Sequence, residues 1–364
     1  GGRFCTEAII RNVTAGVEDI REILHGKGDS LVIGEFDGNV RVHQHTDNPA
    51  GLFDAIAPFG TVDEKKVDDI HRQYLTVHRP LSKTVIVTDS SADIPEAMLD
   101  ELRIQTIAQQ ILFSDETHLD RLTIDNPILV KKIAEKDEFP TSSMASAGSM
   151  RTLFSYLSEY YESIIVISIA AELSGTFQSY RLAAEELLEQ GYPIHIIDSR
   201  KNATAQGLLA LMAARMAADN VPASEIVSMI EQERDRTEIL VSVQNIEHMI
   251  RSGRISGRLG NIARKLHMHP VIGLTKGGGG TIRGVRFSKV GSISSVIQRI
   301  KRAHHTSGIT AFAVSYVRDR ALAEQTAGLI EAATGIAPEF IVPVSPVIAM
   351  FAGDGAVSVA YRTA

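Results

Sequence analysis

Residues 84–95 read TVIVTDSSADIP, and this stretch decides the fold. Its first half is an uninterrupted β-branched run, which is typical of a strand buried on both faces. The hydroxyl and acidic residues that follow lead to Pro95, the residue type that suits the first turn of a helix. Taken alone, this loop is better explained as a helix cap than as a binding site. The stretch therefore predicts one strand–loop–helix step of an α/β fold.

The same step recurs along the rest of the chain. Short β-branched runs, separated mostly by helical patterns, occur at residues 164–169, 194–197, 239–243, 271–275, 309–315 and 340–344. Strands that alternate with helices indicate parallel sheets covered by helices. The glycine run at 277–280 lies between two strand-like pieces and predicts a hairpin tip. We expect an α/β domain over residues 83–364.

Residues 1–80 predict a separate, smaller α/β domain. A strand-like run at 4–10 precedes a helical pattern at 17–24. Asp37-Gly38 lies between two further strands, and this dipeptide tolerates the positive φ angles of a type I′ hairpin turn. Asn48 followed by Pro49 predicts a capped helix start. The charged stretch 64–83 is interpreted as a last helix and a linker, so the boundary is placed near residue 80.

Composition limits the function classes. The chain has 364 residues, 44% of them apolar, and a formal net charge of −7 with scattered Lys and Arg, which does not favour nucleic acid as a partner. A single cysteine fits a reducing cytoplasm, where we expect the protein. No apolar run is long enough for a membrane span, so membrane contact is expected to be transient at most and any lipid must lie inside the fold. The start at Gly1 without methionine suggests a fragment.

Two further loops combine small hydroxyl residues with glycine. They read TSSMASAG at 141–148 and ELSGTFQS at 172–179. Each is explained by a helix N-cap as readily as by a ligand site. An open α/β sheet, however, binds its ligands at such strand-to-loop junctions. Both loops are therefore candidate binding sites.

Together these pieces resemble the DegV family over residues 83–364. Further matches in order are IDS at 197–199, QGL at 206–208, SGRIS at 252–256, PVI at 346–348 and GDG at 353–355. The resemblance implies two α/β lobes that enclose a long-chain fatty acid in a buried tunnel. It also implies that the carboxylate is presented to a kinase domain, which forms an acyl phosphate.

The resemblance also assigns residues to the fatty acid site. The family's Thr-Ser-Gln-Pro-Ser motif places its threonine on Ser142, or on Thr141 after a one-residue shift. The family's Ser-Gly-Thr motif is Ser174-Gly175-Thr176, with Ser174 expected as the main carboxylate donor. Arg254 matches the arginine of Gly-Gly-Arg-Ile, and is expected either to contact the acyl phosphate or kinase or to form a surface salt bridge.

One departure from the family concerns the head group. The family has a histidine two residues before its carboxy-terminal Gly-Pro-Gly, where this sequence has Phe351, and Asp354 replaces the proline. Phenylalanine cannot donate a hydrogen bond. Either the carboxylate is held differently here, or the lipid is of another kind.

The amino-terminal domain carries a candidate metal site. His43 and His45 lie two residues apart on a predicted strand, so both point to one face, and Cys5 lies on another strand. From spacing alone, a half-buried sheet face with polar histidines is the better explanation. This segment also resembles the middle domain of fatty acid kinase, next to its dihydroxyacetone-kinase-like catalytic domain. The resemblance implies zinc held by Cys5, His43 and His45, with Asp47 as a fourth or supporting partner.

The preferred hypothesis is a fusion of kinase middle domain and lipid carrier, itself non-catalytic. The full-length chain would then be a fatty acid kinase, with the catalytic domain before residue 1 or on a separate chain. The middle domain would dock or form a homodimer. Two alternatives stay open. One is a zinc-dependent hydrolase that uses the open metal position; the other is a scaffold whose lipid is only a filler.

Overall fold

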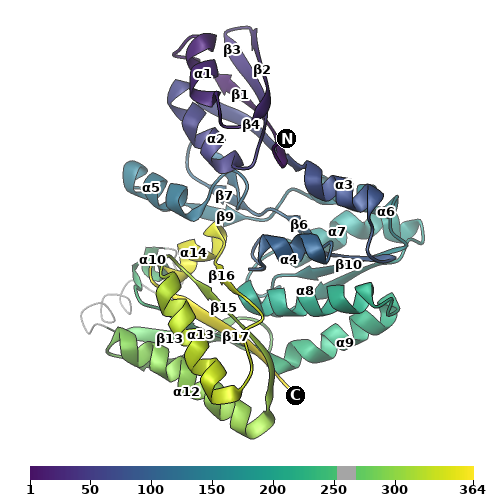
Figure 1. Ribbon diagram of the computed structural model, residues 1–364, viewed down its shortest axis with the longest axis vertical. Helices are drawn as coiled ribbons and strands as arrows, with labels where there is room; N and C mark the ends of the chain where they lie inside the picture. The colour runs from purple at the N-terminus through teal and green to yellow at the C-terminus, as the bar shows by residue number, and fades with distance from the viewer. Residues whose placement is uncertain (252–267) are drawn as a thin grey trace. The chain divides into compact units, whose positions relative to one another are not determined.

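The computed structural model describes residues 1–251 and 268–364, which form two compact units. The first unit contains residues 1–79 and 108–143, and the second contains residues 80–107 and 144–364. Figure 1 shows the elements of both. The chain thus leaves the first unit near residue 80, where the sequence places a boundary. It then returns for residues 108–143, which the sequence did not indicate.

The first part of the first unit is an antiparallel sheet with helices. Its elements are β1 (Phe4–Arg11), α1 (Val17–Leu24), β2 (Asp29–Phe36), β3 (Asn39–Thr46), α2 (Pro49–Ile56), the 3-10 turn Ala57–Phe59, β4 (Thr61–Asp69) and α3 (Ile70–His78). The strand order is β2-β3-β1-β4. Asp37 and Gly38 both have positive φ, as the hairpin prediction requires. Asn48 caps α2 by accepting a hydrogen bond from the Gly51 backbone N–H at 2.9 Å.

The expected last helix of the charged stretch 64–83 is present as α3, but the first residues of the stretch form a strand instead. This is the edge strand β4, which precedes α3. The sequence pattern does not indicate this strand, because it contains the charged residues Asp63, Glu64, Lys65 and Lys66. Charged residues are depleted in strands in general but are tolerated in edge strands. A bulge interrupts the pairing of β4 with β1, and Glu64 has a φ of 50° there.

The second part of the first unit is a small three-stranded sheet with one helix. Its elements are β7 (Gln110–Leu112), β8 (Thr117–Leu119), α5 (Asn126–Lys136) and β9 (Thr141–Ser143). The strand order is β8-β7-β9, with antiparallel pairing throughout. Asp125 caps α5 through the Ile128 backbone N–H at 2.9 Å.

The second unit begins with a parallel sheet of order β11-β10-β5-β6. Its strands and helices are β5 (Thr84–Asp89), α4 (Glu96–Glu101), β6 (Gln105–Ile107), α6 (Ala147–Ser158), β10 (Ser163–Ser168), α7 (Thr176–Glu189), β11 (Ile194–Asp198), α8 (Ala203–Ala218) and α9 (Ala223–Arg236). Val85 and Val87 pack against α6 and α7, whereas Ile86 packs in the cluster that contains α8. Alternation along one strand therefore buries both faces, which confirms the α/β class.

A six-stranded mixed sheet completes the second unit. Its elements are β12 (Thr237–Ser242), α10 (Glu247–Arg251), β13 (His269–Leu274), β14 (Gly280–Arg286), α12 (Lys289–Ser307), β15 (Ile309–Tyr316), α13 (Arg320–Thr334), β16 (Ile341–Pro343), α14 (Pro346–Ala352) and β17 (Val357–Thr363). The strand order is β14-β13-β12-β17-β15-β16. Among the described pairings of this sheet, that of β15 with β16 is the parallel one, and the last strand β17 lies antiparallel between β12 and β15.

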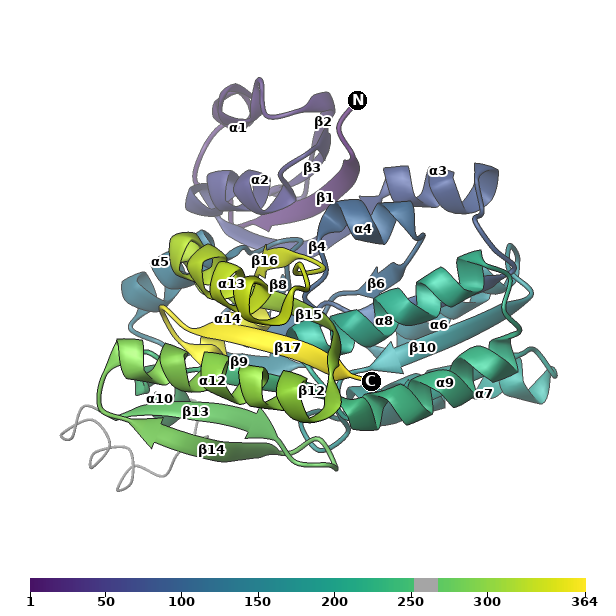
Figure 2. The ribbon, with the colours of Figure 1, turned by 60° about the horizontal axis from the view of Figure 1, so that its bottom comes forward.

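Helix α8 joins the two lobes of the second unit. It packs on the parallel sheet and also on the six-stranded sheet, whose other face is covered by α12 and α13 (Figure 2). Ile239 and Ala360 lie in the α8 cluster, while their neighbours Leu240 and Val359 face α12 and α13. One continuous apolar core therefore spans both lobes.

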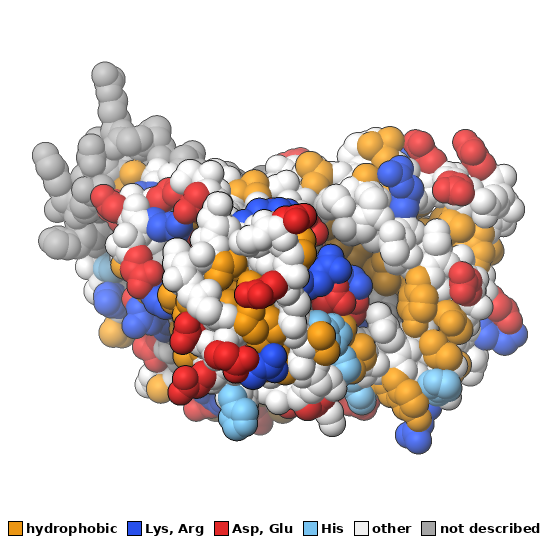
Figure 3. Space-filling view, turned by 90° about the horizontal axis from the view of Figure 1, so that it is seen from above, with side chains coloured by type: hydrophobic (Ala, Val, Ile, Leu, Met, Phe, Trp, Pro, Cys, Tyr) orange, Lys and Arg blue, Asp and Glu red, His pale blue; other side chains and the backbone are white. Residues whose placement is uncertain are grey.

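Two further features concern the charges on the surface and the apolar character of the helices. On the coloured part of the face in Figure 3, Lys and Arg side chains lie interspersed with Asp and Glu side chains. Among the described residues, no helix combines the length and the apolar character needed to cross a membrane.

Candidate functional site

Three side chains of the types that commonly bind metals come together on one face of the first unit's larger sheet. Cys5 lies on β1 and is paired in register with His45 of β3. His43 lies two residues before His45 on the same strand. The Cys5 Sγ atom lies 3.8 Å from His43 Nδ1, and one ligand atom from each of the three residues lies within 4.8 Å of the others. Sulfur and nitrogen ligands of a tetrahedral zinc lie about 3.5 Å apart, so the three residues fit a zinc ion after small side-chain rotations.

Carboxylates surround this group. Glu7 Oε1 lies 3.4 Å from His43 Nδ1, and Asp29 Oδ1 lies 3.6 Å from His45 Nδ1. A carboxylate orients a metal-binding imidazole when it contacts the ring nitrogen that does not hold the metal, whereas Glu7 faces the same His43 nitrogen as the Cys5 sulfur does. Burial raises the pKa of the Cys5 thiol, and the charges of Asp68 and Glu7 raise it further. Asp47 lies outside the three-residue group, and its carboxylate accepts a hydrogen bond from the Arg3 backbone N–H at 2.8 Å.

In the second unit, the predicted Ser-Gly-Thr loop forms the start of α7. Gly175 is the N-cap residue, and the hydroxyl oxygens of Ser174 and Thr176 lie 2.7 Å apart. A Cβ atom at Gly175 would lie 3.1 Å from Met144 Cε, so a larger residue there would require the end of the Met144 side chain to move. Two hydroxyls next to the backbone N–H groups of a helix start make an arrangement suited to an anion.

The loop that holds Ser174 is fixed from two directions. Ile169, just after β10, donates its backbone N–H to Asp89 Oδ2 at 3.0 Å, and Gln206 Nε2 donates to the same oxygen at 3.0 Å. Ala171 donates its backbone N–H to Asp198 Oδ1 at 3.1 Å. Asp89 belongs to the stretch that opens the second unit, so its acidic loop anchors the neighbouring strand end. Sequence patterns do not indicate this role, because the partners lie about eighty and more residues away.

The other predicted lipid-binding residues have different positions. Thr141 and Ser142 are exposed on β9 in the first unit, where Ser142 pairs with Ile111 of β7. Phe351 is half-buried in the last turn of α14. Arg254 lies outside the described residues. The structure thus brings Ser174, Gly175 and Thr176 together and assigns Thr141 and Ser142 to the other unit.

The sequence patterns did not indicate a histidine, His248, that lies beside the end of α14. His248 lies on α10, which contacts α14, and its Cβ would be 3.4 Å from a Cβ atom at Gly353. Burial lowers the pKa of His248 below its ordinary value, and a hydrogen bond with the Met350 backbone offsets only part of this effect. Only the pairing of α10 with α14 in space identifies this residue, because it lies about a hundred positions before Phe351.

Family models match both parts of the chain. The model described as an uncharacterised protein of the DegV family matches residues 83–364. The chain belongs to the DegV family. A second model, which describes the middle domain of proteins like the fatty acid kinase, matches residues 1–77. The first unit therefore combines the kinase-type segment with residues 108–143 of the DegV segment.

DegV proteins of known sequence show the same similarity. A DegV domain-containing protein of Listeria innocua is 28% identical over 191 residues, which cover 52% of this chain and 67% of that protein. One from Clostridium acetobutylicum is 25% identical over 280 residues, which cover 76% of this chain and 97% of that protein.

Solved DegV structures share the fold. A fatty acid binding DegV family protein of Streptococcus agalactiae has a TM-score of 0.68 at 23% identity, and the match covers 78% of this chain and 99% of that one. DegV of Bacillus subtilis, described as a fatty acid binding protein, has a TM-score of 0.68 at 22% identity over 78% and 100% of the two chains. A stearic acid-binding protein of Eubacterium ventriosum has a TM-score of 0.69 at 20% identity over 76% and 97%.

Proposed function

We propose that the DegV segment of this chain binds a long-chain fatty acid and presents its carboxylate to a kinase domain. The observation that carries the proposal is the pair of hydroxyls, Ser174 and Thr176, at the start of α7. A carboxylate inside a protein must accept hydrogen bonds or take up a proton. These hydroxyls and the first backbone N–H groups of α7 supply such donors. Relatives described as fatty acid binding proteins support this choice of ligand.

The acyl chain would supply most of the affinity. Burial of one methylene contributes about 0.8 kcal/mol, so a chain of some fifteen methylenes gains on the order of 10 kcal/mol before the costs of association. The head group then selects an acid over an alcohol or an ester, because only the carboxylate carries the charge that these donors favour.

His248 is the proposed substitute for the histidine that the DegV resemblance expects at position 351. Phe351 has no hydrogen-bonding side-chain atom, whereas the imidazole of His248 lies against the end of the same helix α14. We therefore assign the head-group imidazole to α10. Replacing Phe351 with histidine would restore the family residue and is expected to make His248 dispensable for binding the acid.

The amino-terminal domain would hold a zinc ion through Cys5, His43 and His45. In that site zinc would supply a cross-link between β1 and β3, which fixes the sheet. The match to a kinase middle domain supports a partnership with a kinase catalytic domain, on the same chain or on another. The DegV segment would be the carrier of this pair and the catalytic domain would be the enzyme.

The test begins with the protein as purified. Bound lipid is extracted and identified by mass spectrometry, and the stripped protein is titrated with oleate, stearate and the alcohols of equal length. We expect about one acyl chain per protein and tighter binding of the acids. Absence of acyl chains together with absence of fatty acid binding would refute the proposal.

A further inference from the structure

Residues 108–143, which we name the docking arm, belong to the DegV segment but are part of the first unit. They comprise β7, β8, α5 and β9. Residues 80–107 separate the arm from the kinase-type domain along the chain and belong to the second unit. Contacts between the arm and residues 1–79 therefore do not follow from closeness in sequence.

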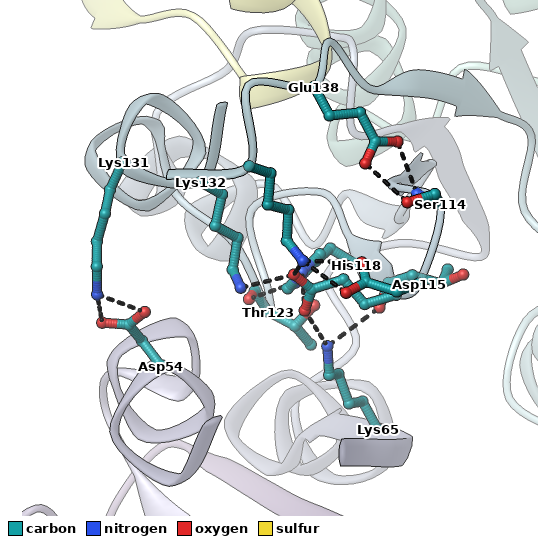
Figure 4. A network of polar contacts seen from close by, with 12 residues as sticks. Asp54, Lys65, Ser114, Asp115, His118, Thr123, Lys131, Lys132 and Glu138 are labelled. Carbon is teal, nitrogen blue, oxygen red and sulfur yellow. Dashed lines mark hydrogen bonds and ion pairs between the residues drawn. The ribbon is translucent and has the colours of Figure 1, made fainter. Parts of the chain in front are cut away.

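A charge cluster lies where the arm contacts the kinase-type domain (Figure 4). Glu116 of the arm lies 2.7 Å from Lys132 Nζ and 3.5 Å from Lys136 Nζ, both on α5. The third lysine close to Glu116 comes from outside the arm. Lys65 of β4 places Nζ 3.6 Å from Glu116 Oε2 and donates to the Thr117 carbonyl oxygen at 3.3 Å. The Glu116 carboxylate thus links a lysine of β4 to two lysines of the arm.

The cluster is largely withdrawn from water. The side chain of Lys65 is 7% exposed, that of Glu116 is 18% exposed and that of His118 is 3% exposed. Burial lowers the pKa of Lys65, and the charge of Glu116 opposes this effect. Burial also acts to raise the pKa of Glu116, but hydrogen bonds from His118 and Lys132 hold it well below its usual value. A buried ion pair selects its partner, because either charge alone is costly to bury.

A second contact fixes orientation. Lys131 of α5 places Nζ 3.0 Å and 3.1 Å from the two carboxylate oxygens of Asp54 on α2. This pair is more exposed than the Glu116 cluster, so it contributes little energy. Two contacts from different elements nevertheless determine how the arm lies on the domain.

We propose that the docking arm is the element by which a DegV carrier recognises a kinase middle domain, and that the two stay bound when the peptide link between them is cut. Recognition requires Lys65 of the middle domain and Glu116 of the arm. Where the two modules are separate chains, a carrier with an acidic residue at the position of Glu116 is the partner that this surface fits.

The proposal has a consequence for phosphorylation that rests on the proposed function. Strand β9 of the arm carries Thr141 and Ser142, the hydroxyls expected from the sequence to bind the carboxylate. They belong to the same unit as the kinase-type domain. Docking would therefore keep strand β9, with Thr141 and Ser142, in the same compact unit as the kinase-type domain.

The experiment uses the whole chain with a specific protease site placed at residues 80–82. After cleavage, the two halves are followed by size-exclusion chromatography and their dissociation constant is measured by dilution. We expect the wild-type halves to elute together at physiological salt. Lys65→Glu should weaken their association about 100-fold, because it places two carboxylates together.

Lys66→Glu is the matched control. It makes the same charge change on the next residue of β4, whose side chain is 60% exposed and pairs with Asp68. It should change the dissociation constant less than about 3-fold. Thermal melting checks that each variant is folded. Should Lys65→Glu fail to fold, Lys65→Met is used instead, with Lys66→Met as its matched control; loss of the buried charge at Lys65 should still weaken association more than loss of the exposed charge at Lys66.

Two results would overturn the proposal. One is separation of the wild-type halves at physiological salt after cleavage. The other is equal weakening by Lys65→Glu and Lys66→Glu in folded proteins. Association is measured without lipid, so the absence of bound fatty acid would refute the carrier function while leaving docking intact.

Discussion

Replacing Ser174 with alanine tests the head-group site most directly. The Ser174 hydroxyl lies 2.7 Å from that of Thr176, and Thr176 is buried. A hydrogen bond to a charged group contributes about 1.5–3 kcal/mol. Because Thr176 keeps its own hydroxyl and can compensate in part, we expect a loss near the lower end, about 1.5–2 kcal/mol. This corresponds to a fatty acid Kd about 10- to 30-fold higher.

The assay separates the head group from the chain. Stripped wild-type protein and Ser174→Ala are titrated with a fluorescent fatty acid, which is then displaced by stearate or by stearyl alcohol. The variant should lose affinity for stearate and keep its affinity for the alcohol within about 3-fold, because acyl burial is unchanged. Its free energy of unfolding without lipid should change by less than about 1 kcal/mol. Ser158→Ala, which removes a hydroxyl at the end of α6, is the control.

Equal loss of affinity for acid and alcohol would refute this reasoning, since it would indicate damage to the fold rather than to carboxylate recognition. An unchanged Kd for stearate would show that the carboxylate lies elsewhere.

Three further predictions concern the metal group, the charge cluster and the core. Cys5→Ala should lower zinc content by elemental analysis from about one equivalent to near zero, whereas the exposed His25→Ala should leave it unchanged. Glu116→Gln should destabilise the first unit by about 2 kcal/mol at pH 7 in urea unfolding. Folding lowers the pKa of Glu116. The stabilisation by Glu116 is therefore complete above its unfolded pKa of about 4.3 and is lost as the pH falls further. The difference in the free energy of unfolding between wild type and variant should shrink over the same pH range. Gly207→Val should lower the free energy of unfolding by about 2–3 kcal/mol, because a Cβ there would lie 3.1 Å from the Asp93 carbonyl oxygen, and equal stability would contradict this packing.

Much of the fold follows from short-range patterns. The predicted strands of residues 83–364 are all present, because β-branched runs between helical patterns have few other structures open to them. The Asp37-Gly38 hairpin and the Asn48 cap were predicted for similarly local reasons. Strand β4 was missed, since its Lys and Glu residues resemble a solvated helix or linker. Its place in the sheet depends on pairing with β1, which the local sequence does not encode.

The candidate sites show the same division. Spacing alone places His43 and His45 on one face of a strand, but only the β1–β3 register brings Cys5 beside them. Ser174 and Thr176 are adjacent because they are neighbours in sequence. His248 lies beside Gly353, at the end of α14, because α10 and α14 come together from distant parts of the chain. The docking arm contacts residues 1–79, although residues 80–107 of the other unit lie between them in the sequence. Contacts of this kind depend on tertiary structure.

The return of the chain for residues 108–143 has a consequence for the order of folding during synthesis. Residues 1–79 leave the ribosome before the arm and can form their sheet, with β4 and Lys65 in place, before the arm exists. At about 5–20 residues per second, the arm follows within several seconds, still ahead of β10, the strand that β5 needs as a neighbour. The folded amino-terminal domain would then be available to bind the arm as soon as the arm has been synthesised. The β5–β6 segment would be tethered to that domain at both of its ends until the remaining strands of the parallel sheet arrive.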